Sequence, residues 1–201
     1  MDSSDSEIES EIEDIKKSIV EGYENSLQKL NLKILIFGPG QGNIDEYAKA
    51  CFKKRLEIKK ILIEKNHTPI LPEEAFEEAE RQGKEYPNIT AFERYLIENC
   101  DISIFLHVPN CPGVDHELSA FSSVPECARK IHYFYANDQD IKLYWPQDDN
   151  IDFIRGSGGR SDSFCREDIG KCNISKKILE TVDSMRRVLV SYPYKKYKEV
   201  K

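Results

Sequence analysis

The sequence has no apolar run of 18 residues and no excess of basic charge, and each absence excludes a class of protein. Without such a run, no membrane-spanning helix is expected. The formal net charge of −7 excludes broad, sequence-independent nucleic-acid binding, which requires a basic face. The negative charge does not exclude binding of a nucleotide, because a few backbone N–H groups and one or two cations are enough to bind a phosphate. The first 14 residues hold seven acids and no base, so we expect no signal peptide and a cytoplasmic location.

Signatures of metal and cofactor sites are also missing. The six cysteines form no CxxC pair, so a zinc ribbon is not expected, and disulfides are rare in a reducing cytosol. Cys165 and Cys172, with six residues between them, are a minor hypothesis for a redox or metal pair. No Ser/His/Asp set, kinase signature, Walker loop or complete GxGxxG fingerprint occurs. We therefore expect no bound metal and no resident cofactor.

The pattern of charge and hydropathy divides the chain into three segments. Residues 1–30 form an acidic segment and an amphipathic helix, 31–145 an α/β domain, and 146–201 a loop, a C-terminal helix and a basic tail on the same domain. The first residues, rich in Ser, Asp and Glu, are expected to be disordered. From Ile8 to about Leu30, apolar residues recur at three- and four-residue steps. This pattern predicts a helix that packs on the domain, on a second copy of the chain or on a protein partner.

Four short apolar runs predict β-strands, at 33–37, 67–71, 102–108 and 131–135. Helical patterns separate these runs, over about 45–64, from 72, over 88–99 and from about 113. Strands separated by helices imply right-handed crossovers and a parallel sheet. We therefore predict an α/β protein, a flavodoxin- or Rossmann-like three-layer sandwich with a mainly parallel sheet of four to five strands. The first run is expected in the centre of the sheet, and Pro69 places the second at an edge.

The pattern after the fourth strand is less regular. Two loops are expected, with a short strand between them as a hypothesis (137–140, 146–150 and 141–145). The glycine-rich stretch 155–160 carries two arginines, and two interpretations stay open: a disordered surface loop, or a lid that closes over a phosphate. A helix is predicted over 175–189, followed by a basic, aromatic tail at 192–201.

Glycine-rich or polar segments follow the predicted strands directly. Ligands of parallel sheets bind outside the carboxyl ends of the strands, so these segments are expected to gather on one rim (38–43, Glu73, 110–117 and 137–140). Glycine lets the backbone approach a ligand closely, and Gly38, Pro39, Gly40 and Gln41 are candidate substrate contacts, with a plain tight turn as an equal alternative. Glu73 either reaches a ligand ribose or stabilises the start of its own helix.

One carboxylate stands in an apolar helical stripe. Val114, Leu118 and Phe121 recur at the spacing of one helix face, and Glu117 falls in or beside that face. The helix N-terminus favours the ionised form of this acid, whereas apolar neighbours disfavour it. A partly desolvated carboxylate suits a nucleophile, or a partner for the oxocarbenium-like centre formed when an N-glycosidic bond breaks.

Residues around this carboxylate are candidates for supporting roles. Asp115 and His116 could orient a sugar hydroxyl or assist a leaving base, and Asp115 equally fits the helix N-cap. Asn110 and Gly113, in the same segment, are candidate substrate contacts. His107, at the end of a strand, is more often a packed histidine than a general base.

The segment Gly113-Val-Asp-His-Glu-Leu-Ser-Ala-Phe121 resembles the Gly-Thr-x-x-Glu-x-Gly-x-Ala signature of nucleoside 2-deoxyribosyltransferases, with the same spacing from glycine to glutamate. The first strand with Gly38-Pro39-Gly40, and the strand Asp101-Ile-Ser-Ile-Phe-Leu, also look like elements of that family. The likeness covers about 33–136 and extends loosely to TIR-like domains that cleave NAD. The resemblance implies that Glu117 is the catalytic residue.

Four residues depart from the family pattern. Val114 replaces the threonine, Ser119 the glycine and Phe121 the alanine, and Cys111 stands where the transferases often carry an aspartate. With these residues, cleavage by water fits as well as sugar transfer, or better. We therefore expect an N-glycosidase that acts on a nucleoside, a nucleotide or NAD. Two alternatives from other classes are a non-catalytic nucleotide-sensing or interaction module of a larger complex and a structural subunit.

Overall fold

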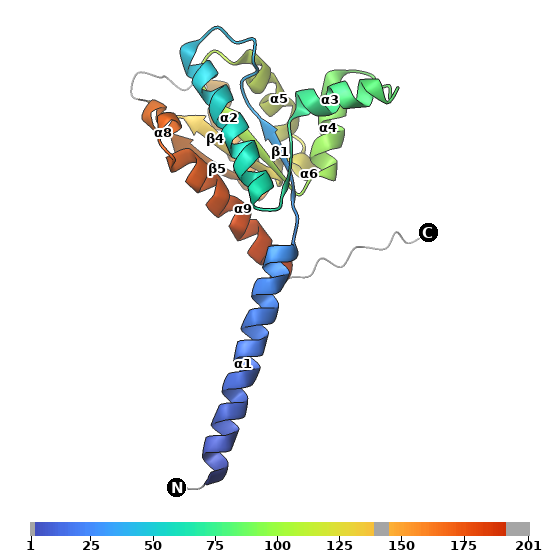
Figure 1. The fold of residues 1–201 in the computed structure, drawn as a ribbon. Helices are drawn as coiled ribbons and strands as arrows, with labels where there is room; N and C mark the ends of the chain where they lie inside the picture. The colour runs from blue at the N-terminus through green and yellow to red at the C-terminus, as the bar shows by residue number, and fades with distance from the viewer. Residues whose placement is uncertain (1–2, 139–144, 192–201) are drawn as a thin grey trace.

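Five parallel β-strands form one sheet in the computed structural model, which describes residues 3–138 and 145–191, with side chains for 12–138 and 149–190 (Figure 1). The strands lie in the order β2-β1-β3-β4-β5, which is the flavodoxin-like order, and the predicted three-layer α/β fold is confirmed. The strands are β1 (Lys33–Phe37), β2 (Thr68–Ile70), β3 (Ile102–His107), β4 (Ile131–Ala136) and β5 (Arg160–Phe164). The described helices are α1 (Ser3–Lys29), α2 (Glu46–Glu64), α3 (Pro72–Arg81), α4 (Ile89–Asn99), α5 (Pro112–Ser122), α6 (Pro125–Ala128), α7 (Trp145–Gly156), α8 (Arg166–Gly170) and α9 (Asn173–Ser191).

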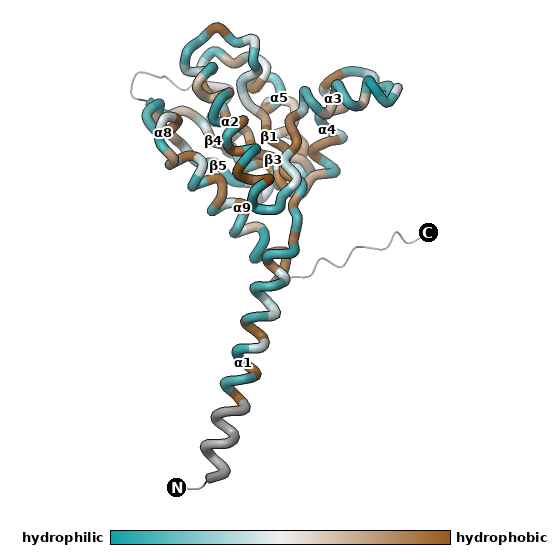
Figure 2. Tube along the Cα trace, viewed as in Figure 1, coloured by the Kyte–Doolittle hydropathy of each residue, from teal (hydrophilic) through white to brown (hydrophobic). Residues whose placement is uncertain are grey.

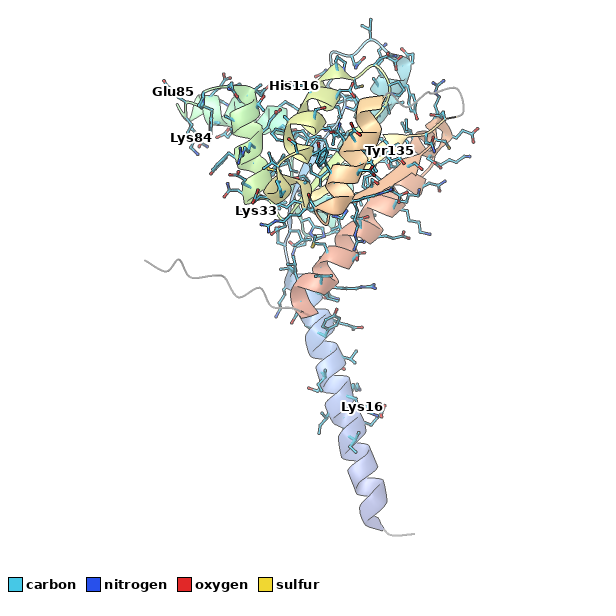
Figure 3. All side chains as sticks on the ribbon, turned by 180° about the vertical axis from the view of Figure 1, so that it is seen from behind. Lys16, Lys33, Lys84, Glu85, His116 and Tyr135 are labelled. Atoms are coloured by element: carbon cyan, nitrogen blue, oxygen red, sulfur yellow. The ribbon has the colours of Figure 1, made fainter. Side chains whose placement is uncertain are left out.

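Helices cover both faces of the sheet. α2, α8 and α9 pack together on one face, and α4, α5, α6 and α7 pack on the other, as Figure 1 and the view from behind in Figure 3 show. Interior strands of such a sheet meet apolar layers on both sides. Accordingly, β3 is buried along all six residues, and β1 is buried except at Lys33. Figure 2 shows the hydrophobic residues concentrated along these strands.

The strand order tests two expectations about position. Lys33–Phe37 was expected in the centre of the sheet, but β1 lies between the edge strand β2 and the central strand β3. The edge position of the proline-containing strand is confirmed, and Pro69 lies opposite Ile34 in the register of β1 and β2. Proline lacks the N–H group that a second neighbouring strand would require, so an edge tolerates it.

The chain after β4 differs from expectation. The segment 146–150, expected as a loop, belongs to α7, where Ile151 and Ile154 are buried. β5 was not expected at all, because its sequence Arg-Ser-Asp-Ser-Phe has one apolar residue. Such a polar run is stable as an edge strand, since it pairs on one side only and charged residues protect its open edge. Residues 139–144, which hold most of the hypothetical strand at 141–145, and the tail at 192–201 lie outside the described residues.

The glycine-rich stretch 155–160 is the turn between α7 and β5. Because all strands are parallel, this turn lies at the amino end of the sheet, opposite the rim where the carboxyl ends meet. Gly159 is tightly packed, since an added Cβ would lie 2.3 Å from the carbonyl oxygen of Ala128 and 2.8 Å from that of Ile131. Gly158 has a left-handed φ of +93°. Both earlier interpretations, a disordered loop and a phosphate lid, are therefore wrong.

Replacing Gly159 with alanine is expected to lower the free energy of unfolding by about 1–3 kcal/mol, because two backbone oxygens occupy the space of the new methyl group. Urea unfolding measures this loss. Gly156→Ala is the matched control: nothing lies within 4 Å of an added Cβ there, and alanine favours the helical conformation of α7. Equal stability of the two variants would contradict the packing of this turn.

α1 extends away from the domain as a long helix (Figure 1). Its C-terminal end contacts α9, where the guanidinium of Arg186 donates a hydrogen bond to the carbonyl oxygen of Leu27. Further out, Ile12, Ile15 and Ile19 are 46%, 59% and 65% exposed, and Figure 2 shows these apolar turns among hydrophilic ones. The predicted packing on the domain is therefore limited to the end of the helix. Packing on a second copy or on a protein partner stays a prediction.

Two further expectations concern α1 and the membrane. The described helix begins at Ser3, so the expected start at Ile8 is wrong, and so is the expected disorder for residues 3–7; residues 1–2 lie outside the described residues. Across the described residues, every helix is too short or too polar to cross a bilayer.

Candidate active site

A cavity of about 850 Å³ opens at the carboxyl ends of β1, β2 and β3. The chain leaves β1 toward α2 on one face and β3 toward α5 on the other, and such a switch point is where parallel sheets bind ligands. Residues of three segments expected on the rim line it together with side chains from α2 and α4 (37–43, 71–74, Glu77, 111–114, Glu117, Phe52, Arg55, Leu56, Ile89 and Glu93). The fourth segment, at 137–138, turns elsewhere, because Asp138 accepts hydrogen bonds from the hydroxyl of Tyr47 and the backbone N–H of Arg166.

A buried arginine forms one wall of the cavity. The side chain of Arg55 is 2% exposed, and its Nε and Nη2 donate to the carbonyl oxygen of Ile36 at 3.0 and 2.7 Å. The same guanidinium makes a bidentate pair with Glu73, with Nη–Oε distances of 2.8 and 2.7 Å. Bidentate pairing of this kind fixes both side chains in one geometry. Glu73 therefore lines the cavity as the partner of a structural cation.

Two acids from different helices meet beside this arginine. Glu93 of α4 is 5% exposed, and Oε2 of Glu117 on α5 is buried with no hydrogen-bond partner among the described residues. Their carboxyls share a hydrogen bond, which requires that one of them is protonated. Desolvation and the charge of Glu93 raise the pKa of Glu117 to about 8, although Arg55 opposes the shift. Desolvation likewise raises the pKa of Glu93 to about 7, so the pair holds one proton at neutral pH.

The acid pair makes the stability of the protein depend on pH. Both folded-state pKa values lie above the usual 4.5, so the folded state binds more protons than the unfolded state within this window. The contribution of the pair to the free energy of unfolding is therefore complete below about pH 4.5, where both acids are protonated. It is lost as the pH rises to about 8. We expect this loss to reach several kcal/mol, because each unit of pKa shift corresponds to about 1.4 kcal/mol.

Urea unfolding across the same pH range measures this loss. In the double variant Glu93→Gln/Glu117→Gln the loss is expected to disappear. In Glu126→Gln, which changes an exposed acid outside the cavity, it is expected to persist. An unchanged slope in the double variant would show that the shared proton does not exist.

Backbone N–H groups face the cavity at the start of α5. Its N-cap, Cys111, provides no side-chain hydrogen bond, and Pro112 occupies the first turn. Gly113 and Val114 carry N–H groups that helix geometry leaves without an intrahelical acceptor. The start of α2 differs, because the Asp45 side chain accepts a hydrogen bond from its first turn. The start of α5 is therefore better suited than the start of α2 to donate hydrogen bonds to oxygen atoms of a ligand.

The glycine turn after β1 approaches the wall formed by β3. An added Cβ at Gly38 would lie 3.2 Å from Cδ of Arg55 and 3.3 Å from the backbone oxygen of Leu106. This crowding explains a glycine at the position. The turn lines the cavity beside the start of α5, where the Asn43 side chain contacts Sγ of Cys111 at 3.6 Å.

Seven of the sequence-predicted site residues line this cavity: Gly38, Pro39, Gly40, Gln41, Glu73, Gly113 and Glu117. Asp115 and His116 do not, because residues one and two positions before Glu117 project from other sides of the helix. Figure 3 labels His116, which is exposed on α5. Asn110 is an exposed turn residue outside the cavity, with a φ of 60°.

Asp115 pairs with a histidine of β3. Its Oδ1 lies 3.0 Å from Nε2 of His107, and Nδ1 of His107 lies 2.6 Å from the hydroxyl of Tyr133. His107 is buried, as expected of a packed histidine. Because the N-cap of α5 is Cys111, the alternative N-cap role of Asp115 is wrong. Asp115 instead ties the first turn of α5 to the sheet.

Sequence reasoning missed Arg55 and Glu93, although both carry the signal that identified Glu117. Arg55 lies in an apolar stripe of α2, three or four residues from Cys51 and Ile58. Glu93 lies in a similar stripe of α4, four residues from both Ile89 and Ile97. Arg55 belongs to a run of basic residues, a pattern that is typical of a solvated helix face and hides the apolar stripe. A charged residue inside an apolar stripe is the pattern that all three share.

Other candidate groups do not form in the described part of the chain. None of its side chains form a cluster of three or more His, Cys, Asp or Glu residues that could hold a metal ion. Cys165 and Cys172 are both free thiols, and the hypothesis that they form a redox or metal pair stays a prediction.

No family model matches this chain, and no curated protein matches its sequence at a significant level. The resemblance to nucleoside 2-deoxyribosyltransferases therefore rests on the segment 113–121 and the two strands named with it. Function has to be inferred from the chemistry of the cavity.

Proposed function

We propose that the protein is a nucleoside deoxyribosyltransferase-like N-glycosidase. It cleaves the bond between a base and C1′ of the sugar in a nucleoside, a nucleotide or NAD. One observation carries the proposal: the side chain of Glu117, whose Oε2 is buried, lines a cavity at the ligand-binding edge of a parallel sheet. The cavity volume of about 850 Å³ falls in the range of small-molecule sites. The proposal retains the cytoplasmic location expected from the sequence.

Glu117 acts at C1′ of the sugar. As the C1′–N bond breaks, its electron pair passes to the base and positive charge develops at C1′. The Glu117 carboxylate attacks or stabilises that centre, and a water molecule then adds to C1′ and releases a proton. Glu117 has the higher pKa of the pair, so it holds the shared proton in the free protein. Glu117 is ionised and can act at C1′ once this proton has passed to Glu93, so Glu93 is a positioning residue for the charge of its neighbour. The free N–H groups of α5 receive sugar oxygens.

Incubation with nucleosides, nucleoside monophosphates and NAD, followed by chromatography for free base, tests this function. Base release is expected from at least one compound and is expected to require Glu117. Release that continues undiminished in Glu117→Gln would overturn the assignment.

A second function is supported by α1. Its exposed isoleucines, at the spacing of one helix face, are typical of a helix that packs on a protein partner. In that case the cavity binds a nucleotide without turnover and the protein is a sensing or interaction module. Calorimetric binding of a nucleotide with no base release would favour this function over the first.

A further inference from the structure

The charges around the cavity are unbalanced. Five carboxylates line it: Glu73, Glu74, Glu77, Glu93 and Glu117. Among the described lining residues, Arg55 is the only cation. Its guanidinium is occupied by Glu73 and by backbone oxygens, so it has no donor directed to a ligand anion.

Pairing removes part of the negative charge. Glu73 is neutralised by Arg55, and Glu74 by Lys59, whose Nζ lies 2.6 Å from Oε1. Glu77, Glu93 and Glu117 remain, and one proton is shared by the last two. The cavity therefore carries about two uncompensated negative charges at neutral pH. Glu93 is 5% exposed and Oε2 of Glu117 is buried, so water screens the charge of this pair poorly, whereas Glu77 is exposed at the mouth of the cavity.

The cavity offers a phosphate few free hydrogen-bond donors and no free cation among the described lining residues. The start of α2, where phosphates often bind beside a glycine turn, is already capped by Asp45. The free N–H groups at the start of α5 lie one turn from Glu117, close to the charge that repels an anion. A cationic ring, in contrast, is attracted by every uncompensated group.

We infer that this site takes a ribosylated cationic heterocycle without a phosphate, such as an N-ribosyl pyridinium, in preference to nucleotides. The inference rests on the proposed N-glycosidase function and narrows its substrate class. The charges that carry it are those of Glu77, Glu93 and Glu117, set against a guanidinium already paired with Glu73.

The chemistry of a cationic substrate fits the acid pair. When the C1′–N bond breaks, its electrons neutralise the ring, so the base leaves without needing a proton. A cation beside Glu117 favours the ionised carboxylate and shifts the shared proton to Glu93. Water supplies the oxygen that bonds to C1′ and gives up one proton to solvent. The balanced products are the neutral base, ribose and a proton.

Nicotinamide riboside and nicotinamide mononucleotide form a matched pair of probes, because they differ only in the phosphate. The wild-type protein is expected to cleave the riboside with a kcat/KM at least about tenfold higher, which corresponds to about 1.4 kcal/mol. Uridine serves as the neutral nucleoside and is expected to react more slowly than the riboside. A preference for the mononucleotide would overturn the inference while supporting the proposed function.

Binding provides a readout that does not depend on turnover. By calorimetry, the N1-methylnicotinamide cation is expected to bind at least about tenfold more tightly than neutral nicotinamide, and added salt reduces the difference. Glu77→Gln is expected to weaken the preference, and Glu126→Gln, outside the cavity, is expected to leave it unchanged. Equal affinities for the two compounds would overturn the inference. A clear preference with no base release from any substrate would overturn the N-glycosidase function instead.

Discussion

Glu117→Gln is expected to reduce base release by about 10²- to 10³-fold, the usual loss when one preorganised electrostatic group at a reacting centre is removed. The amide keeps the size of the side chain and can donate to Glu93, but it cannot carry the negative charge that stabilises C1′. The fold is expected to survive, because the substitution removes a buried acid whose ionisation is disfavoured. Initial rates of base release and the unfolding midpoint measure the two effects.

The control for this variant is Glu126→Gln. Glu126 is an exposed acid in the first turn of α6 and does not line the cavity. It should keep the full rate. If both variants react at the wild-type rate, Glu117 has no role in the chemistry. If Glu117→Gln is inactive but unfolded, the pH dependence of the acid pair remains as a separate test of the site.

Arg55→Met is expected to lower the free energy of unfolding by about 1–3 kcal/mol, the usual cost of leaving a buried hydrogen-bonding group without its partner. The substitution leaves the carbonyl oxygen of Ile36 without its two guanidinium bonds and Glu73 without its cation. Arg55→Lys is expected to recover only part of the loss, because an ammonium cannot bind both groups with the same planar geometry. Urea unfolding measures each variant.

Two further variants separate the causes of this loss. Arg55→Met/Glu73→Gln is expected to be more stable than Arg55→Met alone, since it removes the unpaired carboxylate. Lys60→Met on the same helix is the control, because its pair with Glu64 is 4.0 Å long and exposed, and such pairs contribute about 0–1 kcal/mol. A loss in Arg55→Met no larger than in Lys60→Met would contradict a structural role for the guanidinium.

Arg55 also influences the acid pair. Its charge lowers the pKa of Glu117, so Arg55→Met is expected to move the acid limb of the rate profile to higher pH. Stability and chemistry are therefore linked at this wall of the cavity. Glu93 and Glu117 reduce the free energy of unfolding near neutral pH because they are buried. The guanidinium of Arg55 makes this reduction smaller, because its charge favours the ionised form of Glu117.

Much of the fold could be predicted from local patterns. Four short apolar runs correspond to β1, β2, β3 and β4. Of these, β1, β3 and β4 are apolar because helices cover both of their faces, whereas β2 is a partly exposed edge strand. β5 could not be found in this way, since an edge strand is stabilised by pairing with β4 and needs few apolar residues of its own. Gly159 likewise looked like part of a flexible loop until the backbone oxygens around it were located.

The sequence by itself determined that Glu117 stands in an apolar stripe, and that segments after three strands meet at one edge of the sheet. Both follow from the periodicity of helices and parallel strands, which is local. Only the tertiary structure decided the partners: Glu93 beside Glu117, Arg55 bound to Glu73, and Asp115 turned toward His107. These contacts join residues of different helices and strands, so they depend on how those elements pack. The charge balance of the cavity, and with it the expected substrate, is a property of that packing.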